Sequence, residues 1–264
     1  MKTPNLPVAY NLIALEKVES TNEEAKTLAR KGEIEAPDGT LIWAREQTLG
    51  RGRLGRNWSS PPGNLYTSLI LRPDVPLAKM SELSFVGALA VYDALGSLCE
   101  PGHQVHLKWP NDILLNEKKV AGILLDTETT GKTDEVDWVV LGMGLNVGWH
   151  PEDTDYPATS LRFEQWPTTI EQALEAYTRS FLSWTNRWLD DGFQPIRKSW
   201  LWRCKGQGEM ITVRLGSDIL KGIFRDLDKN GSLVLDCGDE VRHISAGDLY
   251  FSTSNGAPPY AASN

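Results

Sequence analysis

The chain of 264 residues has few of the residues that mark secreted or metal-binding proteins. Its three cysteines, Cys99, Cys204 and Cys237, are odd in number and far apart, and no CxxC pair occurs. This pattern excludes a framework of paired cysteines and indicates reduced thiols in a reducing compartment. Only four histidines are present, and the close pair His103 and His106 has no cysteine beside it, so we predict no metal site.

Long apolar runs are also missing. The first twenty residues contain no apolar run of signal-peptide length, and no segment approaches the roughly 18 apolar residues that a membrane span needs. We therefore expect a cytoplasmic protein with no membrane partner. Hydrophobic residues make up 41% and charged residues 23%, which is typical of a globular chain.

Positive charge is in deficit, and the formal net charge is −8. A phosphate backbone selects for a basic surface, so this balance argues against a general nucleic-acid binder. One basic cluster is an exception, because Arg45, Arg51, Arg53 and Arg56 lie close together and only Glu46 opposes them. Cations at this spacing repel one another unless an anion joins them.

Apolar periodicity predicts a sheet covered by helices. We expect strands at residues 11–20, 40–46, 65–71, 105–109, 120–125 and 136–141. We expect helices from the capping residues Ser20, Thr21 and Asn22 to about residue 31, and at residues 81–98, 168–189 and 193–202. Polar turns at residues 116–118 and 130–132 place strands at hairpin spacing, so the sheet is predicted to be antiparallel or mixed, with helices on one face.

The character of the sequence changes at about Gly206. Short alternating strands are expected at residues 210–215, 219–226 and 233–236, with glycine-containing turns between them. This pattern predicts a small β-barrel. We therefore expect domains at residues 1–205 and 206–252, followed by a flexible tail, 253–264, that is rich in Ser, Pro, Ala and Asn.

A glycine and arginine loop is the first segment that indicates chemistry. Residues 50–56 read GRGRLGR, and residues 58–63 read WSSPPG. Glycines let backbone amides approach an anion closely, and guanidinium groups offer planar, permanently charged donors that suit phosphate. We interpret the loop as a clamp for a polyphosphate or an adenylate. The alternatives are a flexible surface loop or a single RNA-binding repeat of the RGG type.

A second segment reads KWPND at residues 108–112, and KVAGIL follows at residues 119–124. Proline and asparagine make a rigid turn that holds the carboxylate of Asp112 in place. Lys119 begins an apolar stretch, where its burial requires an anionic partner, so we predict a ligand contact. Alternatively, Asp112 is a turn residue that bonds its own backbone.

A third segment, GMGLN at residues 142–146, ends a hydrophobic stretch. It does not match a dinucleotide fingerprint, because neither a helix nor a βαβ unit follows. Its glycines indicate a flat ligand against the backbone, with Asn146 in polar contact. A tight strand end is the alternative interpretation.

Taken in order, these segments resemble the signature stretches of the biotin–protein ligase family across about residues 11–252. The matching stretches are Ser20-Thr21-Asn22, Gln47 with GRGRLGR, KWPND, KVAGIL and GMGLN. Leu49 departs from the alanine that the family often has before the arginine loop. The resemblance implies an α+β fold. Its catalytic domain would have a mixed, largely antiparallel central sheet covered by helices, as in class II aminoacyl-tRNA synthetases, and a small Src-homology-3-like β-barrel would follow.

The resemblance also implies roles for individual residues. The implied catalytic residues are Lys119, Arg51 and Asp112. The implied biotin-binding residues are Ser20, Thr21, Asn22, Gln47, Arg51, Gly52, Arg53, Lys119 and Gly122. The implied nucleotide-binding residues are Arg53, Arg56, Trp58, Asn111 and Asn146.

The implied reaction is the ATP-dependent conversion of biotin to biotinyl-5′-AMP, followed by transfer of biotin to a lysine. The implied acceptor is biotin carboxyl carrier protein of acetyl-CoA carboxylase, or a related carboxylase domain. Mg²⁺ is expected to arrive with the phosphates of ATP, and a homodimer is compatible with the family. Because Ser20-Thr21-Asn22 lies so near the start of the chain, we expect no winged helix and no DNA binding. A lipoate ligase, an octanoyl transferase and an inactive biotin-sensing module are the alternatives.

Overall fold

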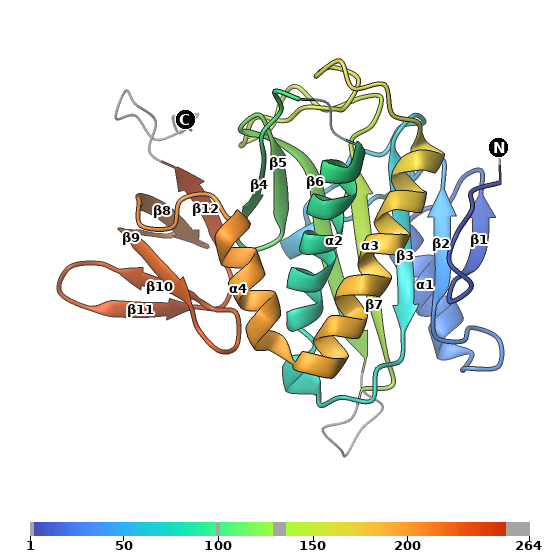
Figure 1. Cartoon of the computed structure of the whole chain (residues 1–264), viewed down its shortest axis with the longest axis horizontal. Helices are drawn as coiled ribbons and strands as arrows, with labels where there is room; N and C mark the ends of the chain where they lie inside the picture. The colour runs from blue at the N-terminus through green and yellow to red at the C-terminus, as the bar shows by residue number, and fades with distance from the viewer. Residues whose placement is uncertain (1–2, 99–100, 129–135, 252–264) are drawn as a thin grey trace.

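The computed structural model describes residues 3–98, 101–128 and 136–251, which form two sheets and four α-helices (Figure 1). The first sheet has seven strands in the order β1-β2-β3-β7-β6-β5-β4. These strands are β1 (Asn11–Leu15), β2 (Thr40–Ala44), β3 (Leu65–Leu71), β4 (Val105–Lys108), β5 (Asp112–Leu115), β6 (Lys118–Glu128) and β7 (Trp138–Leu145). Strands β1 and β2 are parallel, and the other neighbouring pairs are antiparallel. The predicted α+β fold with a mixed, largely antiparallel central sheet is confirmed.

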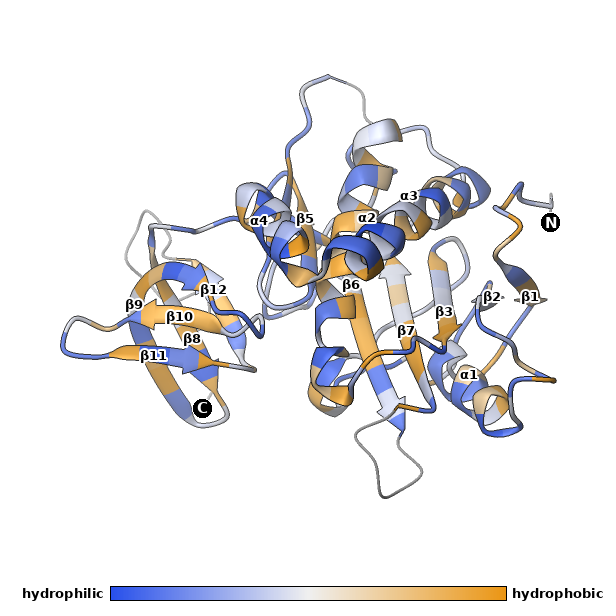
Figure 2. Ribbon diagram, turned by 60° about the horizontal axis from the view of Figure 1, so that its bottom comes forward, coloured by the Kyte–Doolittle hydropathy of each residue, from blue (hydrophilic) through white to orange (hydrophobic). Residues whose placement is uncertain are grey.

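Three helices cover one face of this sheet: α2 (Glu82–Leu98), α3 (Ile170–Asp191) and α4 (Phe193–Arg203). Apolar residues run along α2 and β6 where the two layers meet (Figure 2). Helices were expected on one face of the sheet, and the opposite face is covered as well, because α1 (Thr21–Arg30) packs there. There Ala25 and Ala29 contact a second apolar cluster that contains Ile42 and Val140. Strand side chains alternate between faces, so these apolar residues also need a cover.

The two helix starts next to these faces differ in how they are capped. Thr169 begins α3 with a capping box, in which its hydroxyl accepts from the backbone of Gln172 and the Gln172 side chain accepts from the backbone of Thr169. Ser20 occupies the same position before α1, but its side chain makes no capping bond. The predicted capping residues of α1 are therefore available for other contacts.

The centre of the chain contains a strand that the sequence did not predict, β5, before the turn that it did predict at residues 116–118. Strand β4 ends at Lys108, the Trp109–Pro110 peptide bond is cis, and β5 begins at Asp112. A two-residue turn then leads into β6, with φ of 47° at Asn116 and 69° at Glu117.

The expected strand at residues 11–20 was too long, since β1 ends at Leu15. The turn expected at residues 130–132 lies outside the described residues.

The second sheet has five antiparallel strands in the order β11-β10-β9-β8-β12. They are β8 (Met210–Leu215), β9 (Asp218–Leu227), β10 (Leu233–Asp236), β11 (Val241–Ile244) and β12 (Asp248–Phe251). The predicted small carboxy-terminal β-structure is confirmed, but the sequence had predicted only β8, β9 and β10. The predicted tail, 253–264, lies outside the described residues.

The second sheet packs against α2, α4 and the turn between β4 and β5. The buried indole of Trp109 donates to the carbonyl oxygen of Gly231 at 3.3 Å, and Phe85 lies against the same glycine. Arg197 of α4 also pairs with Asp226 of β9. One apolar core therefore spans both sheets. Within the described ranges, no helix is long and apolar enough to cross a membrane.

Candidate functional site

A cavity of about 410 Å³ lies between the α1 face of the first sheet, the arginine loop and strand β12 of the second sheet. Every residue for which the sequence predicted a binding or catalytic role borders this cavity. They are Ser20, Thr21, Asn22, Gln47, Arg51, Gly52, Arg53, Arg56, Trp58, Asn111, Asp112, Lys119, Gly122 and Asn146. The structure thus brings together segments that are far apart in the sequence.

The start of α1 forms a polar end of the cavity. The backbone N–H and the hydroxyl of Thr21 both donate to Oε1 of Gln47, at 2.8 and 3.0 Å. The Nε2 atom of Gln47 donates to the hydroxyl of Ser60 at 2.9 Å. Ser68, buried on β3, bonds to Thr21 and to Asn22. Residues predicted as helix caps instead build a hydrogen-bonded array beside the cavity.

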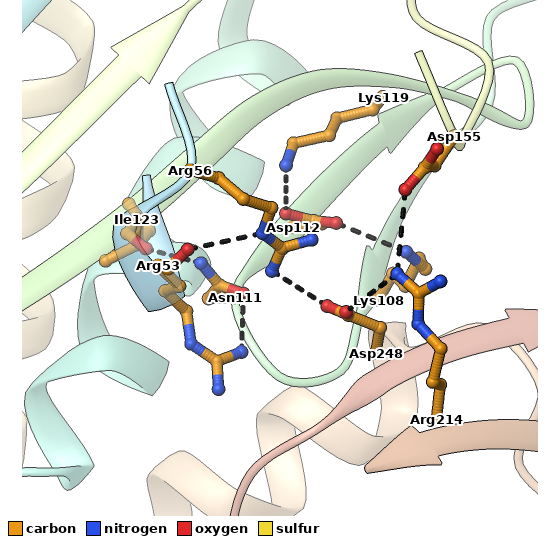
Figure 3. Close-up of polar contacts among 10 residues, drawn as sticks. All are labelled: Arg53, Arg56, Lys108, Asn111, Asp112, Lys119, Ile123, Asp155, Arg214 and Asp248. Atoms are coloured by element: carbon orange, nitrogen blue, oxygen red, sulfur yellow. Dashed lines mark hydrogen bonds and ion pairs between the residues drawn. The ribbon is translucent and has the colours of Figure 1, made fainter. Parts of the chain in front are cut away.

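Two arginines of the loop form ion pairs with carboxylates of the protein itself. Nη1 of Arg51 lies 2.6 Å from Oε1 of Glu23 on α1. Nη2 of Arg56 lies 2.8 Å from Oδ1 of Asp248 on β12 (Figure 3). Arg53 donates to Oδ1 of Asn111 at 3.1 Å. Burial lowers the pKa of Arg53, with the nearby carboxylates opposing that effect. The expected need for an anion is met here by carboxylates.

Glycines on β6 and β7 lie against this loop. A Cβ atom at Gly144 would lie 2.7 Å from the indole of Trp58, and one at Gly122 would lie 3.2 Å from the same ring. The flat group that these glycines admit is therefore Trp58 of the arginine loop. A direct contact between these glycines and a ligand stays a prediction. The buried Nε1 of Trp58 has no hydrogen-bond partner among the described residues.

Asp112 holds two lysines at the centre of the cavity. Its Oδ1 atom lies 2.6 Å from Nζ of Lys119, and its Oδ2 atom lies 3.2 Å from Nζ of Lys108 (Figure 3). Burial on its own raises the pKa of Asp112, but the two ammonium groups outweigh it and lower the pKa to about 2. A carboxylate of this pKa is a poor proton acceptor near neutral pH. Asp112 is thus suited to orient cations, and the interpretation of it as a self-bonded turn residue was wrong.

Several residues of the site were not predicted. Lys108 belongs to the predicted KWPND segment, but it had been given no role of its own. Its buried ammonium lies 4.1 Å from the ring centre of Tyr156 and 5.9 Å from that of Tyr250. Burial lowers the pKa of Lys108. A charged residue in an apolar strand was the available signal, whereas Tyr156 and Tyr250 stand in segments with no motif.

The segment after β7 completes the wall next to Lys119. The backbone N–H of Lys119 donates to the carbonyl of Pro157 at 2.7 Å, and its carbonyl accepts from Thr159 at 2.9 Å. The buried amide of Asn146 donates to the carbonyl of Thr159 at 3.0 Å. Asn146 therefore supports this wall as well as bordering the cavity. Among residues 3–98, 101–128 and 136–251, no three His, Cys, Asp or Glu side chains gather as metal ligands.

Sequence comparison places this geometry among known proteins. The sequence model of the Biotin/lipoate A/B protein ligase family matches residues 6–202, and that of the Biotin protein ligase C terminal domain matches residues 207–252. The chain is 39% identical to a biotin–[acetyl-CoA-carboxylase] ligase of Paracoccus denitrificans, over 90% of this chain and 99% of that protein. It is 35% identical to the bifunctional ligase/repressor BirA of Bacillus subtilis, over 92% of this chain and 74% of that protein.

A solved structure has the same architecture. The biotin protein ligase of Aquifex aeolicus, in complex with biotin and ATP, superposes with a TM-score of 0.76 and is 29% identical. The match covers 92% of this chain and 99% of that chain.

Proposed function

The chain belongs to the biotin/lipoate A/B protein ligase family, and from this premise we propose that it is a biotin–protein ligase. It activates biotin with ATP to give biotinyl-5′-AMP and pyrophosphate. It then transfers biotin to a lysine of biotin carboxyl carrier protein, the acceptor that acetyl-CoA carboxylase supplies. The name of the Paracoccus relative and the ligands of the Aquifex complex support these substrates.

The observation that carries this proposal is the convergence of cations on one cavity. Lys119 comes from β6, whereas Arg51 and Arg53 come from the loop. A carboxylate and a triphosphate repel each other, so bringing them together requires positive charge at the reacting atoms. The cavity supplies that charge in an otherwise acidic protein.

In the first half-reaction a carboxylate oxygen of biotin attacks the α-phosphorus of ATP, and the bond to pyrophosphate breaks. Lys119 is placed to neutralise charge on the carboxylate and the α-phosphate, while Arg51 and Arg53 close over them. For this step Arg51 exchanges Glu23 for a phosphate oxygen. One such contact typically contributes roughly 10² to 10³ in rate.

In the second half-reaction the acceptor amine attacks the acyl carbon of the adenylate, and AMP leaves. A mixed anhydride hydrolyses when water reaches it, so the closed loop protects the intermediate. The acceptor lysine attacks as the neutral amine, after its proton is lost to water, and Asp112 holds Lys119 beside the reacting atoms. Asn111, Arg56 and Trp58 face the nucleotide, and the unpartnered indole N–H of Trp58 supports a ligand contact.

Two further assignments belong to this proposal. Residues 1–205 form the catalytic domain and residues 206–252 a second domain that contributes Asp248 and Tyr250 to the cavity, which the two separate family matches support. Mg²⁺ is expected to arrive bound to the phosphates of ATP, because this ion is usually held in part by the phosphates of the substrate. The unbridged thiols of Cys204 and Cys237 are consistent with reaction in the cytoplasm.

Lipoate is the competing substrate, since the family includes lipoate ligases. The test combines purified protein, ATP, an acceptor domain and either biotin or lipoate, and measures acceptor modification by mass spectrometry. We expect addition of a biotinyl group and none of a lipoyl group. Lipoylation of its acceptor domain without biotinylation would contradict the assignment.

A further inference from the structure

Asp126 of β6 contacts the polar end of the cavity without bordering the cavity itself. Its Oδ2 atom accepts a hydrogen bond from Nδ2 of Asn22 at 3.0 Å. The other side of the Asn22 amide, Oδ1, accepts from the hydroxyl of Ser68 and lies over Gly142, where even a Cβ atom would be too close. Asn22 is only 4% exposed, so its amide is held on both sides.

The charge on Asp126 decides which way this amide points. An ionised carboxylate only accepts hydrogen bonds, so it binds the NH₂ end of Asn22 and repels the carbonyl end. Without Asp126 the amide has no partner that distinguishes its two ends, because the hydroxyl of Ser68 both donates and accepts. Asp126 therefore fixes the carbonyl oxygen of Asn22 on the side of Ser68 and Gly142.

The neighbouring amide is fixed in a parallel way. Nε2 of Gln47 donates to the hydroxyl of Ser60, and the Ser60 proton is directed to the carbonyl of Trp58 at 2.8 Å. The Thr21 hydroxyl donates its proton in a hydrogen bond to Oε1 of Gln47. The single proton of Ser68 goes to Thr21 or to Asn22. With these protons committed, the Thr21 hydroxyl and the Asn22 carbonyl, which border the cavity, are left with lone pairs that accept.

We propose that Asp126 is a positioning residue that makes this end of the cavity an acceptor array selective for a ligand with N–H donors. Resting on the proposed function, that ligand group is the ureido ring of biotin. The dithiolane of lipoate carries no N–H group and cannot satisfy the array, so its binding would leave buried acceptors unpaired. The selection between the two ligands of the family then depends on a residue that touches neither.

Asp126 also lies 3.8 Å from the ammonium of Lys26, and this ion pair needs to be separated from the hydrogen bond to Asn22. Lys26 has a second and closer partner in Glu23, at 2.6 Å. A matched ion pair lies two residues along the same strand, where Glu128 binds Arg30 of α1 at 2.6 Å. Glu128 joins the same two elements as Asp126 but does not bond a residue of the cavity wall.

The experiment measures binding of biotin to the full chain by isothermal titration calorimetry without ATP. The variants are Asp126→Leu, Lys26→Met and Glu128→Leu. We expect Asp126→Leu to weaken biotin binding by roughly ten-fold or more, the size typical of losing a charge-assisted hydrogen bond. Lys26→Met and Glu128→Leu should bind biotin like the parent. The affinity for desthiobiotin, which keeps the ureido ring, should fall in Asp126→Leu by the same factor as the affinity for biotin.

A double-mutant cycle with Asn22→Ala tests whether Asp126 acts through Asn22. In the Asn22→Ala background, Asp126→Leu should cause no further loss. The proposal would be overturned if Asp126→Leu weakened biotin binding further in that background. It would also be overturned if Asp126→Leu alone bound biotin like the parent, or if Lys26→Met lost as much affinity as Asp126→Leu. A parent that binds lipoate and not biotin would overturn the proposed function instead, so the two failures are distinct.

Discussion

Arg56 and Asp248 are 192 residues apart in the sequence and are joined by a 2.8 Å hydrogen bond that links the arginine loop to the second sheet. Asp248 also lies 3.7 Å from Arg214 of β8. The carboxylate thus holds two cations at the edge of the cavity (Figure 3). If the loop binds the nucleotide, the second sheet contributes through this contact.

We expect Asp248→Asn to raise the KM for ATP by roughly two- to five-fold, the range for a partly exposed ion pair, while the KM for biotin stays close to the parent. The measurement is steady-state pyrophosphate release at varied ATP and at varied biotin. Asp236→Asn is the control, because it breaks the Arg225 pair of 2.8 Å in the same sheet, outside the cavity wall. A rise in the KM for ATP in Asp236→Asn as large as that in Asp248→Asn would contradict a specific role of Asp248.

The position of the arginine loop depends on the packing of the Trp58 indole against Gly144. We expect Gly144→Ala to displace the indole, because the new methyl group would lie 2.7 Å from it. The loop at residues 47–62 should then be cleaved faster by protease, and biotin plus ATP should protect it less than in the parent. Gly96→Ala on α2 is the control, since a Cβ atom there meets nothing within 4 Å. Unchanged cleavage in Gly144→Ala would show that Trp58 does not hold the loop closed.

Asp112 predicts a pH dependence of stability. Its pKa is lowered to about 2, so its ion pairs stabilise the fold above the pKa of about 4 that the carboxyl has when unfolded. This contribution is lost as the pH falls from about 4 to about 2. Asp112→Asn leaves the buried Lys108 without its carboxylate, which typically costs about 3 to 5 kcal/mol.

The measurement is urea unfolding of the parent and of Asp112→Asn from pH 7 down to pH 3. We expect the variant to be much less stable at pH 7 and the difference to shrink in acid. A difference that stays constant over this range would mean that the carboxylate is not the stabilising group.

The sequence predicted the site better than it predicted the way in which the site is held together. Motif segments such as KWPND and GRGRLGR carry their own signal, because charge in apolar or glycine-rich surroundings is costly without a partner. The partners themselves were not predictable. Glu23 and Asp248 are ordinary surface carboxylates in the sequence, and only the folded chain brings them to Arg51 and Arg56.

Most helices and strands were predicted near their bounds, the short strand β10 included, but the short strands β5, β11 and β12 were missed. Strand β3 was placed correctly because it is rich in apolar residues and all seven of its residues are buried. Strands β5 and β12 have four residues each, and pairing with neighbours rather than their own pattern makes them strands. Asp112 and Asp248 stand at the first positions of these two strands, so their register could not be read from the chain.

Lys119, held by Asp112, is predicted to activate the biotin carboxylate. Lys119→Gln removes the charge and keeps polarity, whereas Lys118→Gln alters the preceding residue, which lies near Glu164 and the ring of Phe163 instead. Single-turnover pyrophosphate release from biotin and ATP measures adenylate formation, and transfer from supplied biotinyl-5′-AMP to an acceptor domain measures the second half-reaction.

The most direct test is the rate of that single-turnover pyrophosphate release in the two variants. We predict that Lys119→Gln slows it by roughly 10² to 10³, that Lys118→Gln matches the parent, and that transfer from supplied adenylate is affected much less. Pyrophosphate release by Lys119→Gln at the parental rate would show that Lys119 does not activate the biotin carboxylate.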